Sequence, residues 1–396
     1  MRLPWLLMVG MLILNILTDF YLYRIAKSRT KGTALKNIQL YSSVCLYLFI
    51  IVTICLPRRS GDDSELRAIM WMLFAYFSIY IPKYIFIIFD LISLIPELAH
   101  HKRIKIVSII GGIISVVVFL LMWWGALINR FSIDVKTVNV EIENLPDEFN
   151  GFTILQFSDF HVGTYGNDTI FVQQVVDEIN SIKPDLIVFT GDIVNRRTSE
   201  LIPFIKVLSQ LHAKYGVYSI LGNHDYGDYS VWPDEAAKAA NMDSLYKFND
   251  MMGWKLLLNS HEWIKKGNDS IAIIGVENIG DPPFPKYGSL EKAYLNLSDS
   301  QTKILLSHNP AHWVDDISKS DTINIALTLS GHTHAMQIAF LGFSPAEWRY
   351  PTWGGMYADQ ANRKKLYVNI GLGTVGIPMR IGATPELTLF TLHTVN

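Results

Sequence analysis

The stretch from Phe152 to His161, FTILQFSDFH, sets the pattern for the C-terminal part of the chain. It begins as a short apolar run, typical of a buried strand, and ends in a turn that carries Asp159 and His161. The same arrangement recurs in residues 185–192 (DLIVFTGD) and 216–225 (GVYSILGNHD). Strands that repeatedly end in polar turns predict an α/β domain whose site lies beyond the strand ends.

Further strand-like runs lie before and after these three stretches. Residues 138–146 (VNVEIENLP) alternate apolar and polar side chains, and later runs are IAIIGVEN, KILLSHNP, IALTLSGHTH, KLYVNIGLG and PELTLFTL. Helical patterns are predicted over Ile170–Ile182, ending near Pro184, and over Leu201–Leu211, where Pro203 falls in the first turn. Strands and helices in alternation indicate a largely buried sheet.

Five of the polar turns contain the residue types that bind divalent metals. They read SDFH (158–161), GD (191–192), GNHD (222–225), SH (307–308) and GHTH (331–334). A single loop histidine is more often a surface or satisfied residue, so the prediction rests on the recurrence of these turns after strands. Imidazole and carboxylate ligands without sulfur suit manganese, iron, zinc or cobalt.

This residue set fits phosphate ester cleavage. Two divalent ions about 3.5–4 Å apart lower the pKa of a bound water and neutralise charge on the phosphoryl oxygens. Asp192 is placed in the sequence to bridge two ions, and His332 and His334 could reach different ions. Glycines at 191, 222 and 331 would permit tight turns close to the metals.

The ordered blocks FSDFH, TGD, GNHD, SH and GHTH closely resemble those of the calcineurin-like metallophosphoesterases, over roughly residues 150–335. The flanking segments LPDEFNGFTILQFSDFHVG and VNIGLGTVGIPMRIGATPELTLFTL resemble the membrane-associated bacterial branch of that family. That branch includes phosphodiesterases and pyrophosphatases that cleave UDP-diacylglucosamine. The resemblance implies an α/β, four-layer sandwich of two mixed β-sheets flanked by helices.

The resemblance also implies a role for each polar residue of the blocks. The residues implied at the first metal are Asp159, His161 and His334, and those at the second are Asn223, His308 and His332. Asp192 would bridge the two ions. His224 would face the phosphate and either donate a proton to the leaving oxygen or stabilise the transition state, and Asp225 would orient His224.

Charge divides the chain into two parts. Residues 1–130 carry 14 Lys/Arg and 6 Asp/Glu, a net charge of +8, whereas residues 131–396 carry 20 and 30, a net charge of −10. We therefore predict a transmembrane region at 1–130 and a catalytic domain at 131–396. The acidic domain argues against nucleic acid as a partner. Cys45 and Cys55 lie ten residues apart in one apolar run, which excludes a disulfide framework.

Four apolar stretches of about 20 residues precede the acidic domain, at 3–23, 38–56, 68–95 and 106–128. The first lacks a small-x-small cleavage site, which favours a retained helix over a signal peptide. Eight Lys/Arg lie in the first and third loops, at 24, 27, 29, 31, 36, 102, 103 and 105, and three lie in the second, at 58, 59 and 67. The positive-inside rule then predicts a multi-pass cell-membrane protein with an extracytoplasmic catalytic domain.

Several residues allow more than one interpretation. Lys83 and Asp90 interrupt the third stretch, about 10 Å apart along a helix, so they are either functional groups or lie near an interface. Arg380 would contact a substrate phosphate or form a surface salt bridge. Four aromatic residues after the GHTH block would line an apolar channel, enter a lipid interface, or pack as an ordinary loop: Trp348, Tyr350, Trp353 and Tyr357.

The expected function is metal-dependent hydrolysis of a phosphomonoester or phosphodiester near the bilayer, with a lipid-linked substrate as one option. A pyrophosphatase acting on a nucleotide-linked lipid, such as UDP-diacylglucosamine, is the alternative within enzymes. A non-catalytic membrane sensor that kept the fold is a second alternative, against which the complete ligand set argues. A transport path through the helices, with the hydrolase as accessory, rests only on Lys83 and Asp90.

Overall fold

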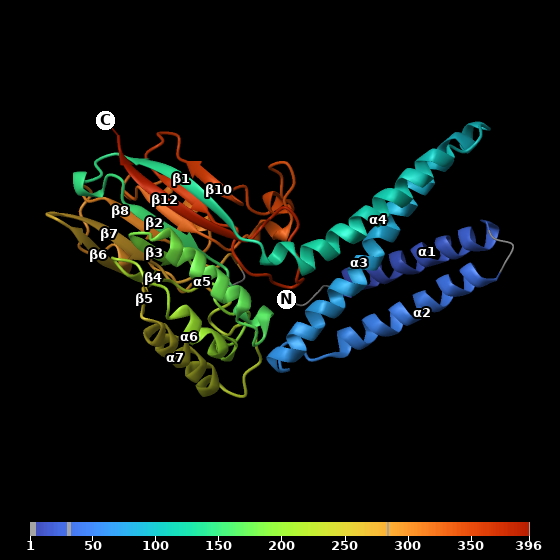
Figure 1. Ribbon diagram of the computed structural model, residues 1–396, viewed down its shortest axis with the longest axis horizontal. Coiled ribbons are helices and arrows are strands. Elements are labelled where there is room, and N and C mark those ends of the chain that lie inside the picture. Colours follow the sequence, from blue (N-terminus) through green and yellow to red (C-terminus); the bar gives the residue numbers. More distant parts are fainter. Residues whose placement is uncertain (1–4, 30–32, 283–284, 396) are drawn as a thin grey trace. The chain divides into compact units, whose positions relative to one another are not determined.

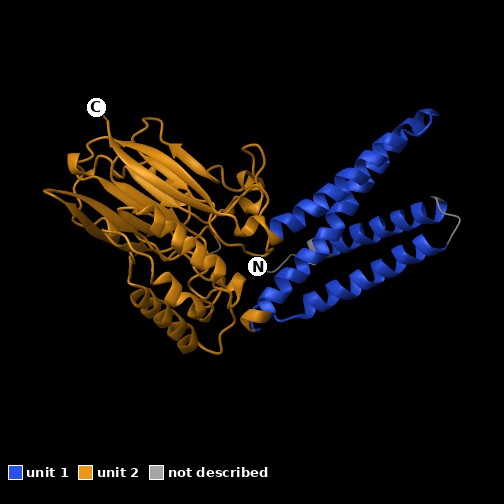
Figure 2. Ribbon diagram, viewed as in Figure 1, with its two compact units in different colours: residues 1–61, 65–126 blue, residues 62–64, 127–396 orange. Residues whose placement is uncertain are grey.

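The computed structural model describes residues 5–29, 33–282 and 285–395 (Figure 1). The chain divides into two compact units (Figure 2). Unit 1 contains residues 1–61 and 65–126, and unit 2 contains residues 62–64 and 127–396. Unit 1 is helical, and unit 2 contains both sheets.

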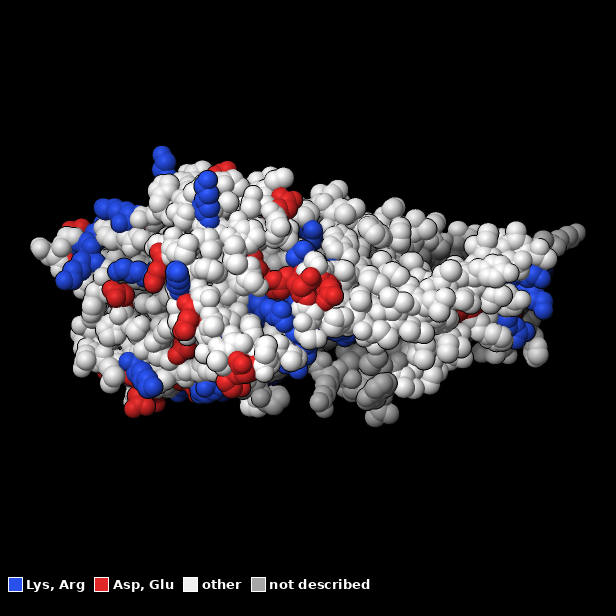
Figure 3. All heavy atoms as spheres, turned by 90° about the horizontal axis from the view of Figure 1, so that it is seen from below, with Lys and Arg blue, Asp and Glu red and all other residues white. Residues whose placement is uncertain are grey.

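Unit 1 contains four long helices, α1 (Trp5–Arg29), α2 (Ala34–Cys55), α3 (Asp63–Leu94) and α4 (Lys105–Leu127). All four are long and apolar enough to cross a membrane, which confirms the four predicted spans. Figure 3 shows a broad surface on these helices without Lys, Arg, Asp or Glu. Residues 3 and 4 of the first predicted span, and Lys31 of the first loop, lie outside the described residues.

Lys83 forms an ion pair inside unit 1, with a residue of another helix. Its Nζ donates to Asp19 Oδ1 on α1 at 2.8 Å. Gln39 of α2 also donates to this carboxylate, and so do the hydroxyls of Tyr47 and Tyr80, at 3.0, 2.8 and 2.7 Å. The Asp19 carboxylate therefore connects α1, α2 and α3 at a point where an unpaired charge would be costly.

Asp90 has a separate set of partners in unit 1. Its carboxylate accepts hydrogen bonds from Tyr21 of α1 at 2.8 Å, from Arg103 and from Ser108 of α4. Lys83 and Asp90 are thus each paired with an oppositely charged residue of unit 1, and not with each other. Helices α3 and α4 lie close together here, since a Cβ on Gly111 of α4 would meet the Cβ of Phe89 on α3 at 2.3 Å.

Unit 2 contains two six-stranded mixed sheets. Sheet A has the order β1 (Asp134–Ile142), β12 (Glu386–Thr394), β2 (Thr153–Phe157), β3 (Leu186–Phe189), β4 (Val217–Ser219) and β5 (Trp254–Leu256). β1 is parallel to β12, β12 is antiparallel to β2, and β2 to β5 are parallel. Sheet A therefore brings the carboxyl ends of β2, β3 and β4 to one edge.

Sheet B has the order β10 (Gly355–Ala358), β11 (Lys365–Val368), β9 (Leu327–Ser330), β8 (Lys303–Leu306), β7 (Asp269–Gly275) and β6 (Ser260–Lys266). β11, β9, β8 and β7 are parallel, and the two outer strands are antiparallel to their neighbours. The carboxyl ends of β8 and β9 precede His308 and His332.

Apolar side chains fill the space between the sheets and cover their outer faces. The core between the sheets includes Ile154 and Val188 from sheet A and Ile304 and Leu329 from sheet B. Helix α5 (Ile170–Ile182) packs on the other face of sheet A, together with α6 (Ile205–Leu208) and α7 (Glu235–Met252) (Figure 1). α8 (Leu290–Ala293) and a π-helical turn (Trp313–Ile317) pack on sheet B. The predicted fold of two mixed sheets flanked by helices is confirmed.

The predicted helices match the structure unevenly. Ile170–Ile182 is α5 as predicted, whereas Leu201–Leu211 is a 3₁₀ segment (Thr198–Phe204) followed by the single turn α6. Pro203 lies inside the 3₁₀ segment and not in a first helical turn as predicted, so its missing N–H removes one donor from that segment. Helix α7 was not predicted. Its buried residues are Asn241, Leu245, Asn249 and Met252, so it lacks a clear apolar stripe.

The Asp19–Lys83 pair gives a stability prediction. Asp19→Leu leaves the half-buried Lys83 ammonium without its carboxylate and should lower the free energy of unfolding of the detergent-solubilised protein by about 3 kcal/mol. The double change Asp19→Leu with Lys83→Met removes both charges and should recover most of the loss. Scanning fluorimetry would measure both variants. A single variant as stable as the parent would show that the pair does not hold the helices together.

Candidate metal centre

Hydrogen bonds between loops bring the five predicted turns together at the carboxyl ends of the strands. The amide of Asp159 donates to the Gly191 carbonyl at 2.9 Å, and the amide of His161 donates to the Asp192 carbonyl at 3.1 Å. The amide of Gly331 donates to the His308 carbonyl at 2.9 Å. The site is thus assembled from the ends of strands in both sheets.

Asp159, His161 and His334 form the first group of candidate metal ligands. His161 Nε2 lies 3.0 Å from His334 Nε2, which lies 3.3 Å from Asp159 Oδ1. His161 Nδ1 donates to the Val194 carbonyl at 3.1 Å, so the lone pair of a neutral His161 is on Nε2. Three donor atoms therefore converge on one point.

Asp192, His308 and His332 form the second group. His308 Nδ1 donates to the Thr190 carbonyl at 2.7 Å, which leaves Nε2 facing Asp192 Oδ2 and Asn223 Oδ1, both at 3.2 Å. His332 Nδ1 lies 3.3 Å from His308 Nε2. Asn223 thus joins this group through its carbonyl oxygen.

Asp192 lies between the two groups. Its Oδ2 is 3.2 Å from His308 Nε2 and 3.7 Å from His161 Nε2. Its Oδ1 accepts the amide N–H of His224 at 2.8 Å. One oxygen of this carboxylate therefore faces both groups while the other holds the backbone of the GNHD turn.

Crowding at the turns explains two of the glycines. A Cβ on Gly222 would lie 2.2 Å from Asp192 Oδ1, and a Cβ on Gly331 would lie 2.2 Å from Asp159 Oδ2. Any larger residue at either position would push a candidate ligand out of place.

The electrostatics of the buried groups suit a cation. Burial lowers the pKa of His161 and of His332 to about 3, so their ring nitrogens keep free lone pairs at neutral pH. Burial and the neighbouring Asp192 raise the pKa of Asp159 to about 6. Burial lowers the pKa of His308, but the Asp192 and Asp159 carboxylates outweigh it and raise that pKa overall. Two buried carboxylates thus attract positive charge, which divalent ions could supply.

His224 is oriented by a backbone carbonyl and a ring that the sequence analysis did not anticipate. Its Nδ1 donates to the Asn195 carbonyl at 2.5 Å. Its imidazole stacks on Tyr229 with ring centroids 4.2 Å apart and an interplanar angle of 20°. The Tyr229 hydroxyl also accepts Asn223 Nδ2 at 2.9 Å, which turns the Asn223 carbonyl oxygen toward His308. Both interactions fix residues of the GNHD turn.

Asp225 binds backbone amides rather than the His224 ring, so any effect on His224 passes through the loops. Its fully buried carboxylate accepts the amide N–H groups of Asp192 and Gly222 on Oδ2, both at 2.8 Å. Oδ1 accepts the amides of Ile193 and Val194 at 2.9 and 3.3 Å. Asp225 therefore joins the GD turn to the GNHD turn through the backbone.

Tyr350 and Asp281 form a chain of hydrogen bonds that leads from His332 of the second group away from the other candidate ligands. The Tyr350 hydroxyl lies 2.9 Å from His332 Nε2 and 3.0 Å from Asp281 Oδ2. Asp281 also accepts Arg349 Nη2 at 2.8 Å. When the His332 lone pair is on Nδ1, Nε2–H donates to Tyr350 and Tyr350 donates to Asp281. The sequence carried no signal for Asp281, which lies far from any motif.

Arg380 takes neither of its predicted roles. It is fully buried and donates to the carbonyls of Gly373, Ala383 and Ile370 at 2.7, 2.9 and 3.0 Å. Its Nη2 also lies 3.3 Å from His334 Nδ1. Arg380 thus supports the loops behind the first group.

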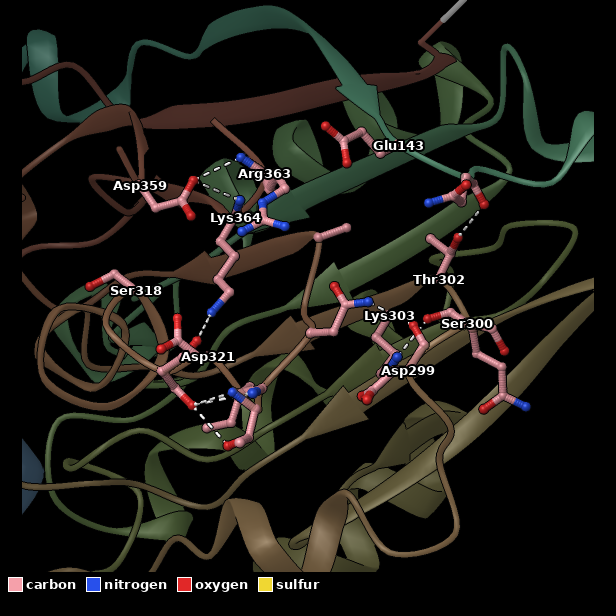
Figure 4. Close-up of a pocket in the computed structure, with 17 residues that line it drawn as sticks. Glu143, Asp299, Ser300, Thr302, Lys303, Ser318, Asp321, Asp359, Arg363 and Lys364 are labelled. Atoms are coloured by element: carbon pink, nitrogen blue, oxygen red, sulfur yellow. Dashed lines mark hydrogen bonds between the residues drawn. The ribbon is translucent and has the colours of Figure 1, made fainter. Parts of the chain in front are cut away.

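A separate polar cavity of about 340 Å³ lies at the amino ends of β8 and β9, so it is not part of this site (Figure 4). Lys303 donates there to the carbonyls of Ser298 and Gln301 at 2.7 and 2.6 Å, and Lys364 donates to the carbonyls of Ile317 and Ser320. These amines support loops.

Comparison with known proteins identifies the class. Residues 152–336 match the calcineurin-like phosphoesterase family, and residues 1–130 match a family described as probable calcineurin-like phosphoesterase, transmembrane domain. The uncharacterized metallophosphoesterase YkuE of Bacillus subtilis is 33% identical over 263 residues, covering 64% of this chain and 82% of that protein. The chain belongs to the calcineurin-like metallophosphoesterases.

Other relatives share the membrane region. An uncharacterized metallophosphoesterase of Campylobacter jejuni is 28% identical over 370 residues, covering 89% of each chain. A transmembrane protein with metallophosphoesterase domain from Danio rerio is 27% identical over 345 residues, covering 83% of this chain and 75% of that protein. Among solved structures, a dimetal phosphatase from Danio rerio aligns with a TM-score of 0.33 and 13% identity, over 56% of this chain and 88% of that one. The protein is a phosphoester hydrolase with a membrane-spanning N-terminal region.

Asp225→Ala should destabilise unit 2 without removing a candidate ligand. It would leave four buried N–H groups without an acceptor, at a cost of about 3 kcal/mol or more. Scanning fluorimetry of the full chain in detergent would measure the loss. The exposed Asp177 on α5 provides a control, since Asp177→Ala should change the melting temperature little. Equal melting temperatures for the two variants would contradict the role given to Asp225.

Proposed function

We propose that this protein hydrolyses phosphoesters with two divalent metal ions held at the candidate metal centre. The first ion would be bound by Asp159, His161 and His334, and the second by Asn223, His308 and His332. The observation that carries the proposal is the position of Asp192 Oδ2, between His161 Nε2 at 3.7 Å and His308 Nε2 at 3.2 Å, where one oxygen can bridge two ions. When bound, such ions supply a water of lowered pKa and neutralise the phosphoryl oxygens.

The substrate would enter where the site is least buried. Asn223, His224 and His332 are half-buried, whereas Asp159, His161, Asp192 and His308 are buried. The phosphoryl group would therefore meet His224 and the second group first. The fully buried first group would then lie deepest.

His224 would act on the leaving group. Because Nδ1–H donates to the Asn195 carbonyl, Nε2 carries a proton only in the imidazolium form. That cation can stabilise charge on the phosphoryl oxygens or pass its Nε2 proton to the leaving oxygen. Stacking on Tyr229 would hold the ring in place for either role.

Manganese, iron, zinc and cobalt all suit the donor set of imidazoles, carboxylates and one amide oxygen. The substrate class would be a phosphomonoester or a phosphodiester, with a lipid-linked ester favoured by the membrane helices. A nucleotide-linked lipid pyrophosphate, such as UDP-diacylglucosamine, is the alternative, and it requires a cytoplasmic catalytic domain. A sensor without activity would not need the complete and converging ligand set.

The catalytic domain would lie on the extracytoplasmic side of the membrane. Loops one and three carry eight Lys/Arg, and the second loop carries three. A reporter fused after residue 396 would test this orientation in cells. Alkaline phosphatase activity is expected, and fluorescence from a cytoplasm-only reporter would instead favour the pyrophosphatase.

Two substitutions separate metal binding from proton transfer. Asp192→Asn should reduce bound metal in a manganese-loaded preparation and abolish hydrolysis of an aryl phosphate ester. His224→Ala should keep the metal content and reduce kcat by about 10²–10⁴-fold. Elemental analysis and a chromogenic assay would measure both properties.

The exposed Asp177→Ala variant serves as the control for both substitutions and should match the parent. Chelation of the parent should give the same loss of activity as Asp192→Asn, with recovery when manganese is returned. Full activity in both the Asp192 and His224 variants would disprove the assignment.

Tyr350→Phe tests the support of the second group. Without the hydroxyl, His332 Nε2–H has no acceptor in the Tyr350–Asp281 chain, so Nδ1 would be a poorer ligand. Metal affinity at the weaker site should fall about 10–100-fold, measured by calorimetric titration of the apoprotein. Tyr357→Phe, an aromatic change outside this chain of hydrogen bonds, should leave the affinity unchanged. Equal affinities for the two variants would show that Tyr350 does not position His332.

A further inference from the structure

An apolar hairpin follows directly after the GHTH motif and extends into solvent. Phe340 and Phe343 exchange backbone hydrogen bonds of 2.8 and 3.0 Å across a two-residue turn. Phe340 is 74% exposed, Leu341 is 90% exposed and the nearby Trp348 is 82% exposed. No Asp, Glu, Lys or Arg occurs from residue 335 to residue 346. We call residues 338–348 the apolar hairpin.

The turn residues are unusual for a turn that faces water. Leu341 has φ of 50° and Gly342 has φ of 82°, which is the backbone of a type I′ turn. The first position of such a turn is usually Asn, Asp or Gly, because a left-handed backbone is unfavourable for a residue like leucine. A large apolar residue at the tip therefore has no benefit for the turn itself and indicates a contact outside the domain.

The hairpin starts next to the residues where the fourth span ends. Asn129, just beyond the end of α4, donates through Nδ2 to the Arg380 carbonyl at 3.0 Å. The next residue, Ile381, pairs with the base of the hairpin, since it accepts the Ala339 amide and donates to the Gln337 carbonyl, both at 2.9 Å. The base of the hairpin and the start of unit 2 are therefore connected through one short segment.

The apolar hairpin is connected to the candidate metal centre at both ends. His334 precedes the hairpin, and Tyr350, which follows it, contacts His332 at 2.9 Å. The base is also fixed by Gln337, which donates to the carbonyls of Ile377 and Met379 at 2.7 and 3.0 Å. A contact made by the tip would thus fix the position of the half-buried side of the candidate metal centre, where His332 lies.

We propose that the apolar hairpin inserts into the interface of the bilayer that the chain's own helices span. The occupant is lipid because residues 338–346 of the hairpin carry no charge, because it starts beside the exit of a membrane helix, and because Trp348 is of the type enriched at lipid headgroups. The metal centre then acts on the phosphoester headgroup of a membrane lipid. This last step rests on the proposed hydrolase function.

Spin labels on the full chain test the insertion. In a Cys45→Ser, Cys55→Ser background, a nitroxide would be attached to Leu341→Cys and, as the control, to Leu295→Cys, which is 59% exposed before β8. In phosphatidylcholine–phosphatidylglycerol vesicles, the label at 341 should be relaxed by oxygen and shielded from a water-soluble nickel complex. The label at 295 should show the reverse. A water-accessible label at 341 would overturn the proposal.

The same labels distinguish lipid from protein as the occupant. When the purified protein is transferred to detergent, a lipid-inserted label at 341 should contact the detergent chains and stay accessible to oxygen. Spin–spin broadening between labels at 341 would instead reveal a second copy and overturn the proposal.

A soluble hairpin variant tests the substrate class. Phe340→Ser, Leu341→Asn and Trp348→Gln together remove the apolar tip, and asparagine suits the left-handed turn. Hydrolysis of an aryl phosphate ester in detergent should stay within about twofold, and hydrolysis of phosphatidic acid or phosphatidylglycerol in vesicles should fall roughly tenfold. The control variant Met251→Asn with Leu295→Asn should lose neither activity.

The outcomes separate the two proposals. If the parent hydrolyses neither the aryl ester nor lipid, the proposed function fails, while the label at 341 still decides the insertion. If the parent hydrolyses the aryl ester but neither lipid, or if the hairpin variant keeps full lipid activity, the lipid substrate class is overturned.

Discussion

The buried carboxylate of Asp225 determines where residues 192–194 and Gly222 lie, and most of the candidate site depends on those residues. By accepting the amides of residues 192, 193 and 194 as well as that of Gly222, it fixes the loop after β3 against the loop after β4. The fixed loop then directs its carbonyls outward. Those of Asp192 and Val194 hold His161, and that of Asn195 holds His224. Two histidines from different strands are thus oriented by one segment of backbone.

This arrangement requires unfavourable backbone conformations at the candidate ligands themselves. Positive φ angles occur at Asp159, His161, Asp192, His332 and His334. Each left-handed residue other than glycine costs roughly 1–2 kcal/mol. The cost continues past His334, because Ala335, Met336 and Gln337 also have positive φ. The two packed sheets and the bonds of Gln337 hold these conformations, as expected where strain accompanies function.

The candidate ligands could be found in the sequence because their residue types stand out in short blocks that follow strands, and the structure brings these blocks together. The parts that it could not predict depend on contacts between distant segments. The backbone carbonyl of Asn195 and the carboxylate of Asp281 have no side-chain signature near a motif, and the four amide partners of Asp225 are backbone groups. Lys83 lacked a visible partner for the same reason, since Asp19 lies on a different helix. α7 was missed because little of its surface is buried.

The position of β12 affects how the protein is made. β1 leaves the ribosome soon after the fourth span, but among the described strands it pairs in sheet A with β12 alone, more than 240 residues later, with Asp134 opposite Glu386. At a synthesis rate of about 5–20 residues per second, β1 waits for roughly 10–50 s before that partner exists. Sheet A can close only after β12 has been translated. The helices can therefore be anchored in the bilayer well before the hydrolase is complete, and its unfinished strands stay tethered at the membrane during that interval.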